Sequence, residues 1–193
     1  MRAKKRNFKT QNLIVALIAI SFAFQVLSPA AALAASAREI DRDARAALAK
    51  LYQHTPGAKA LADKAVGVLV FPSIVKGGFI IAGQFGDGAL RKDGKTVAYY
   101  RSLAASFGYQ AGVQEFGYVL FFMDDASLQY LDRSEGFELG VGPSLVVLDA
   151  GFGKNMSTTT LQKGVYAFIF DQKGLMGGMG IQGTKITRIN PNP

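Results

Sequence analysis

The sequence places one lysine in the middle of a long apolar stretch. Residues 65–90 read AVGVLVFPSIVKGGFIIAGQFGDGAL, and Lys76 stands between an apolar run and a pair of glycines. A fully buried lysine without a partner is energetically costly. Lys76 therefore lies either in a turn between two strands or at an opening where a cation and apolar side chains meet an anionic, apolar ligand. The two alternatives are compatible, and both stay open at this point.

Other kinds of chemistry lack the residues that they need. The chain has no cysteine and a single histidine, His54, so thiolate chemistry and a zinc or copper site are not indicated. GALRKDGKT, from Gly88, has five residues where a phosphate-binding loop has four. GMGIQG, residues 178–183, is followed by TKITRINPNP, which does not form the helix that a dinucleotide site requires. We predict no metal, no cofactor and no enzymatic activity.

The first residues have the three regions of a secretory signal. Five basic residues precede the apolar run 13–24, and small residues follow up to Ala32-Leu33-Ala34, which matches a cleavage site. We predict a cleaved signal peptide at residues 1–34 and a periplasmic or envelope-associated protein. The alternative is an uncleaved anchor, because residues 13–35 are long enough to span a bilayer.

Removing this segment changes the charge of the protein. It carries five of the 22 basic residues and none of the 14 acidic ones, which leaves 17 against 14 and a net charge of +3. Nucleic-acid binding requires a concentrated basic stripe, so we do not predict it. A local basic patch for anionic lipid remains compatible with this charge.

Two helices should begin the remaining domain. Residues 38–53 place Ile40, Ala44 and Leu51 on one apolar stripe of an amphipathic helix. A second helix should follow Thr55, which suits the N-cap position ahead of a proline.

Beyond the helices the apolar period changes to two. Residues 106–114 and 136–144 alternate as strands do, and Asp93-Gly94 is typical of a hairpin turn. YVLFFM, residues 118–123, is apolar on both sides and predicts a strand buried on both faces. One short helix should interrupt the strands at residues 124–131.

The 22 glycines all follow residue 34, and many fall inside the predicted strands. Glycine occurs in strands at bulges, at tight bends or where another backbone comes close. We therefore predict one domain, residues 35–193, of the α+β class. Its N-terminal helices should pack on a strongly curved, mostly antiparallel, glycine-rich sheet, either a sandwich or a barrel.

An ordered set of motifs resembles the SYLF domain family. The motifs are KAVGVLVFPSIVKGGFIIAGQFGDG, SFGYQAGVQEFGYVLFFM, GVGPSLVVLDAG and VYAFIFDQKGLMGGMGIQGTKI. The resemblance covers residues 38–190, and with the signal peptide it is similar to the exported bacterial branch. It implies a non-enzymatic module that binds anionic phospholipid through basic and apolar residues.

The resemblance also implies site residues. Lys76 precedes the Gly-Phe pair that ends in Phe79, and Lys173 begins the later Lys-Gly-Leu motif. Lys64 and Lys163 complete the predicted lipid-binding set. Eukaryotic members carry SH3 or FYVE modules beside the domain, and this sequence has neither, so we do not expect actin binding. An envelope would offer phosphatidylglycerol and cardiolipin rather than phosphoinositides.

Three alternatives to a lipid-binding domain remain. A small outer-membrane β-barrel fits the signal, the length and the alternating strands, although the two helices argue against it. A structural envelope protein without a specific ligand and a hydrolase with an unrecognised site are the others.

Overall fold

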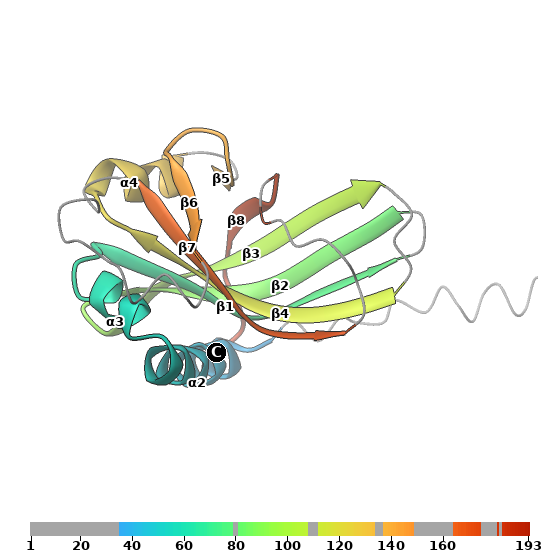
Figure 1. Cartoon of the computed structure of the whole chain (residues 1–193), viewed down its shortest axis with the longest axis horizontal. Helices are drawn as coiled ribbons and strands as arrows, with labels where there is room; N and C mark the ends of the chain where they lie inside the picture. Colours follow the sequence, from blue (N-terminus) through green and yellow to red (C-terminus); the bar gives the residue numbers. More distant parts are fainter. Residues whose placement is uncertain are drawn as a thin grey trace, which may run out of the picture. The chain divides into compact units, whose positions relative to one another are not determined.

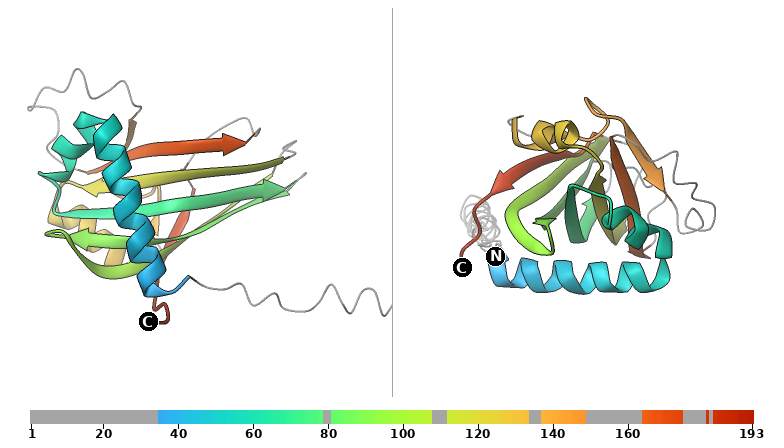
Figure 2. Two further views of the ribbon diagram at one scale, coloured as in Figure 1. Left: turned by 90° about the horizontal axis from the view of Figure 1, so that it is seen from below. Right: turned by 90° about the vertical axis from the view of Figure 1, so that its left-hand side faces the viewer.

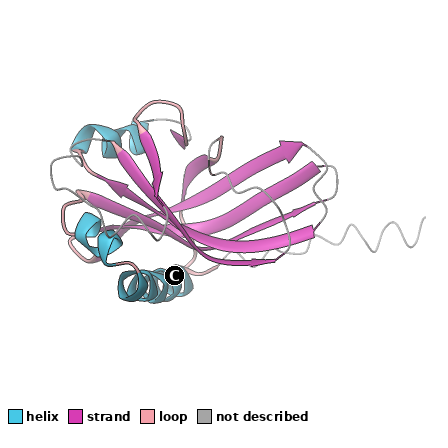
Figure 3. Ribbon diagram, viewed as in Figure 1, coloured by secondary structure: helices cyan, strands magenta, loops and turns pink. Residues whose placement is uncertain are grey.

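We describe the protein from a computed structural model. The structure describes residues 35–78, 81–107, 112–133, 137–148, 164–174, 181 and 183–193. Residues 35–193 form one compact unit. The predicted signal peptide lies outside the described residues. Strands dominate this unit, and the helices gather around one end of them (Figure 3).

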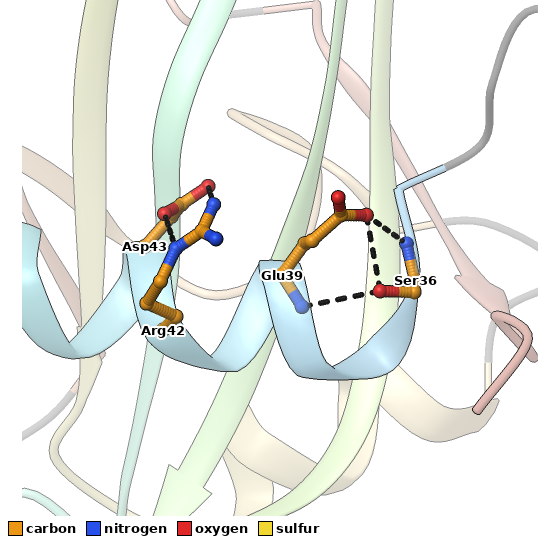
Figure 4. A network of polar contacts seen from close by, with 4 residues as sticks. All are labelled: Ser36, Glu39, Arg42 and Asp43. Carbon is orange, nitrogen blue, oxygen red and sulfur yellow. Dashed lines mark hydrogen bonds and ion pairs between the residues drawn. The ribbon is translucent and has the colours of Figure 1, made fainter.

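Two helices precede the sheet, as predicted. Helix α2 spans Ala37–His54 and helix α3 spans Pro56–Ala62. A capping box starts α2, because Ser36 and Glu39 exchange hydrogen bonds between side chain and backbone (Figure 4). These bonds lower the pKa of Glu39 below its ordinary 4.5, since they favour the carboxylate.

Eight strands form one curled sheet in the order β5-β8-β3-β2-β1-β4-β7-β6 (Figure 1). Every pair is antiparallel except β6–β7. The predicted α+β class with a strongly curved, mostly antiparallel sheet is therefore confirmed. The strands are β1 Gly67–Gly78, β2 Ile81–Lys92, β3 Lys95–Phe107, β4 Gly112–Phe122, β5 Phe137–Glu138, β6 Leu145–Leu148, β7 Val165–Gly174 and β8 Lys185–Ile189.

Both faces of the sheet carry an apolar core. On the outer face, the stripe of α2 from Ile40 to Leu51 packs with α3 over Val70, Phe121 and Phe168. On the inner face, which the curled strands enclose, Phe71, Tyr118 and Leu120 pack against helix α4 (Asp125–Arg133). Figure 2 shows α2 crossing the outer face near one end of the strands.

Glycines allow the sheet to bend where β1 is irregular. The register of β1 shifts against β2 between Val70 and Val75 and against β4 between Phe71 and Ile74, around Pro72-Ser73. A Cβ on Gly88 would lie 2.3 Å from the carbonyl oxygen of Val70, and one on Gly86 would lie 2.4 Å from that of Ser73. Only glycine permits β2 to approach the bulged strand so closely, which confirms the close-approach explanation.

Several local predictions are confirmed. Asp93 and Gly94 form the β2–β3 turn with φ of 48° and 73°, as the hairpin required. Residues 118–122 of β4 are fully buried. Helix α4 begins where Asp124 accepts a hydrogen bond from the Ser127 backbone amide at 2.8 Å.

Of the alternating residues 106–114, residues 106–107 belong to β3 and residues 112–114 to β4, and those between them lie outside the described part of the chain. The other alternating segment was wrong in extent. Residues 136–144 contain only the two-residue β5, and Gly140 and Gly142, with φ of 95° and 98°, end the strand conformation.

Candidate functional site

The sheet has two ends that differ in what covers them. Strands β1 to β4 run past α2, and their far ends have no described helix over them (Figure 2). We call this part the open end, and define it as residues 74–78, 82–86, 102–105 and 112–116. It contains Lys76, the lysine that stands in the middle of a long apolar stretch of the sequence.

A row of polar residues, interrupted at Ala104 of β3, crosses the inner face of the open end. Lys76 in β1 is paired in register with Gln84 in β2 and with Gln114 in β4. Thr184, directly before β8, continues the row beyond β3. These four side chains are 9%, 5%, 5% and 0% exposed, respectively. We call them the inner polar row.

Only some of the polar side chains in this region form hydrogen bonds with other described residues. Gln84 Nε2 donates to Thr184 Oγ1 at 3.5 Å, and Tyr118, two inward-facing positions deeper on β4, donates to Ser102 Oγ at 2.8 Å. Burial raises the pKa of Tyr118 well above its usual value, so the phenol stays a neutral donor. The inner face thus changes from apolar to polar where the strands leave the helices.

The outer face of the open end shows the opposite change. Val75, Phe85 and Leu103 lie side by side on β1, β2 and β3, and they are 49%, 42% and 43% exposed. Val113 on β4, near them on the same face, is 66% exposed. We call these four residues the outer apolar strip. Water-exposed strands normally place polar residues outside, so the pattern is inverted here.

Charged groups border the strip on both sides. On one side of the outer apolar strip, Val75 pairs with Glu115 of β4, which pairs with Lys173 of β7. On the other side, Leu103 pairs with Lys185 of β8. Both lysines are exposed, and no ion pair of either lysine is found among the described residues. The Glu115 carboxylate accepts a hydrogen bond from Ser73 Oγ at 2.9 Å.

An arginine stacks on the aromatic residue of the strip. The Arg101 guanidinium lies 4.9 Å from the centre of the Phe85 ring. Asp87 holds it with two hydrogen bonds of 2.7 and 2.9 Å, and hydrogen bonding to Asp87 raises the pKa of Arg101. The cation that contacts Phe85 is thereby fixed in place.

The structure brings only part of the predicted site together. Lys76 and Lys173 lie at the same end of the sheet, but on opposite faces, because Lys173 pairs with Glu115 and Lys76 pairs with its neighbour Gln114. Lys64 is exposed after α3, at the other end of β1. Phe79 and Lys163 lie outside the described residues. Lys76 itself is in a strand, not in a turn.

Sequence reasoning missed most residues of both surfaces. Lys185, Gln84 and Gln114 were not singled out, and neither was the strip. The bulge at Pro72-Ser73 shifts the alternation of β1, so Val75 looks like a core residue in sequence. A usable signal was the alternation of Gln84 with Phe85, which puts a polar and a large apolar residue on opposite faces.

A groove also lies at the helix-covered end. It has a volume of about 510 Å³ and lies between the two N-terminal helices and the β2–β3 turn. Two of the four cations that line it are engaged, since Lys59 pairs with Asp63 and Arg91 donates to Thr96 and to the Gly94 carbonyl. Burial raises the pKa of its Tyr52 to about 12. None of the large exposed apolar side chains of the described chain lines this groove, unlike the open end.

Comparison of the sequence with known protein families gives a match. Residues 103–191 match the family model described as "Ysc84: Las17-binding protein actin regulator". Over these residues, the chain is similar to the SYLF (Ysc84) family. The match runs from β3 through β8 and confirms the resemblance read from the motifs. SYLF domains are lipid-binding, non-catalytic modules, and the coarse functional prediction of lipid binding agrees with this.

No curated protein matches the chain in sequence. In the described part of the chain, no helix has both the length and the hydropathy to cross a membrane.

Proposed function

We propose that this domain binds the surface of anionic phospholipid membranes with the open end of its sheet. The observation that carries the proposal is the outer apolar strip, three adjacent side chains 42–49% exposed across three strands. An exposed apolar patch of this kind marks a surface that another apolar phase covers.

Contact with lipid would bury the strip. Fully burying a valine, leucine or phenylalanine side chain contributes about 1.5–3 kcal/mol. Each residue of the strip is about half exposed, so insertion contributes on the order of 1 kcal/mol per residue. Three or four such residues give weak, reversible binding, as expected of a peripheral module.

The lysines beside the strip supply the preference for anionic lipid. Lys173 and Lys185 flank it at opposite sides, and each basic residue near an anionic surface contributes about 1 kcal/mol. Glu115 and Glu138 occupy neighbouring register positions, so the net charge of this face is small. The lysines therefore orient the domain, and the apolar strip anchors it.

Liposome flotation tests the proposal. Wild-type protein should float with vesicles that contain phosphatidylglycerol and much less with pure phosphatidylcholine. The double variant Lys173→Glu/Lys185→Glu should weaken binding by about tenfold or more, because it loses two favourable charges. Binding of the wild type should also fall as salt rises.

A matched control reverses two lysines elsewhere. Lys92→Glu/Lys95→Glu changes the same charge at the β2–β3 turn, at the helix-covered end. It should float like the wild type. Equal losses in the two double variants would mean that only net charge matters, and the open end would then not be the binding surface.

The cellular setting is part of the same proposal. The basic start, the apolar run and Ala32-Leu33-Ala34 support export to a bacterial envelope, where phosphatidylglycerol and cardiolipin are the anionic lipids. N-terminal sequencing of the protein from the envelope fraction should begin near Ala35. A mature chain that still starts at Met1 would contradict cleavage.

A further inference from the structure

The inner polar row holds a buried lysine for which the described residues supply no counter-charge. Lys76 is 9% exposed, and among the described residues it forms no ion pair and no side-chain hydrogen bond. Buried lysines are almost always paired. Beside it, Gln114 is 5% exposed and its Oε1 has no hydrogen-bond partner. A lysine without a partner among the described residues thus lies beside a buried amide oxygen that has none.

Acidic residues of the described sheet do not compensate the charge. Asp87 and Glu115 are on the outer face, where Arg101 and Ser73 hold them. Asp132 of α4 faces inward, but it accepts a hydrogen bond from Tyr100 at 2.6 Å at the helix-covered end. The row is therefore positive within the described part of the chain, and it offers amide groups on both sides of the ammonium.

We propose that the inner polar row binds the phosphate group of a single phospholipid, an inference that rests on the phospholipid binding proposed above. The Lys76 ammonium supplies the counter-charge and three donors. The amides of Gln84 and Gln114, its register neighbours on either side, supply further donors once Gln114 turns its Nε2 inward. A phosphate oxyanion satisfies all of these groups, whereas a neutral ligand leaves the charge unpaired.

The inner face carries only small residues between the row and the strand ends. Toward the strand ends the inner face continues with Gly78, Ala82 and Gly112, which carry little or no side chain. A Cβ on Gly112 would meet no atom within 4 Å. A phosphate that enters from this end reaches Lys76 while the rest of the lipid remains beside the outer apolar strip.

Thermal unfolding of the full chain with soluble probes tests the site. The probes are inorganic phosphate, dihexanoylphosphatidylglycerol below its micelle concentration, and dihexanoylglycerol, which lacks phosphate. At about 100 times its dissociation constant, a bound probe should raise the melting temperature by about 5–10 °C. Lys76→Met should abolish this shift without lowering the melting temperature of the free protein, since it removes an uncompensated charge. Lys95→Met makes the same change at the exposed β2–β3 turn and should respond like the wild type.

The outcomes separate the sources of the phosphate. A shift with the phosphatidylglycerol alone assigns the site to a lipid head group, and a shift with inorganic phosphate as well assigns it to phosphate in general; both support the site if Lys76→Met loses them. No shift in the wild type, an equal shift in Lys76→Met, or an equal shift with dihexanoylglycerol overturns it. If Lys76→Met does not fold, Gln114→Met decides, because it should weaken binding about tenfold or more. Unchanged affinity in that variant contradicts the site.

The two experiments allow the inner site and the membrane proposal to fail separately. Flotation tests the outer face, and the thermal shift tests the inner face. If flotation depends on Lys173 and Lys185 but no probe shifts the melting temperature, only the inner site falls. If the probes act through Lys76 but vesicles do not bind, the membrane surface falls and a soluble phosphate ligand remains.

Discussion

The two ends of the curled sheet follow opposite rules of polarity. At the helix-covered end, apolar residues are buried on both faces: Phe121 packs outward under the helices and Leu120 packs inward, and neither is exposed. At the open end, Phe85 faces outward and is 42% exposed, while its neighbour Gln84 faces inward and is buried. The same four strands build both ends.

The outer faces of the two ends differ in role because α2 and α3 cover one of them and leave the other exposed. Where α2 and α3 cover the outer face, apolar residues contribute to folding. Where the helices stop, the strands keep an apolar outer face that stability does not need, and they acquire a polar interior that folding does not favour. Both features at the open end cost stability unless a ligand covers them, which is the reason to place function there.

Truncating one phenylalanine at each end gives the largest contrast. Phe121→Ala should lower the free energy of unfolding by about 3–5 kcal/mol, because it leaves a cavity beside Phe168 under the helices. Phe85→Ala should cost about 1 kcal/mol or less, chiefly its contact with Arg101. Urea unfolding measures both, and similar losses would mean that Phe85 is a structural residue.

Two glycines of β2 offer a smaller contrast. Gly88→Ala should destabilise the fold by about 1–3 kcal/mol, because the new methyl would meet the Val70 carbonyl and the Phe71 ring. Gly83→Ala, on the outer face of the open end, meets no atom within 4 Å and should be neutral or stabilising by up to about 1 kcal/mol. Thermal unfolding checks the pair, and a destabilised Gly83→Ala would indicate that the open end is more tightly packed than it looks.

The smallest expected effect concerns the start of α2. Ser36→Ala removes the cap and should cost about 1 kcal/mol at neutral pH. The Glu39 pKa is lowered in the folded state, so this carboxylate stabilises the fold above its unfolded pKa, and the contribution is lost as pH falls through the folded pKa. The difference in stability between wild type and Glu39→Gln should therefore shrink below pH 4.5. A difference that stays constant down to strongly acidic pH would contradict the capping role.

Much of the fold could be predicted from local patterns. The stripe from Ile40 to Leu51, the Asp93-Gly94 turn and the fully apolar run of β4 each point to one structure, and each was found. These features depend on residues close together in sequence. Alternation across residues 136–144 failed, because Gly140 and Gly142 end the strand conformation although the apolar period continues.

The site was only partly predictable for a different reason. Which face a residue occupies depends on the bulge at Pro72-Ser73, and which face is inner depends on how the whole sheet curls. Lys76 was found because a lysine in an apolar run is unusual on its own. Gln84, Gln114 and Lys185 became meaningful only when the register placed them beside Lys76 and the strip.

The central claim is that the outer face of the open end, and not that of the covered end, touches lipid. Val75 and Val97 form a matched pair for this test, since both are valines in strands with 49% exposure, one at the open end and one near the β2–β3 turn. The chain has no cysteine, so Val75→Cys and Val97→Cys each carry a single site for an environment-sensitive dye such as NBD.

The measurement is the emission of each labelled protein on titration with phosphatidylglycerol vesicles. We predict a blue shift and an intensity increase for the dye at residue 75, where it enters the apolar phase, and no change for the dye at residue 97. Quenching by brominated acyl chains should likewise occur only at residue 75. Vesicle-bound protein whose dye responds equally at both positions, or only at residue 97, would contradict the claim.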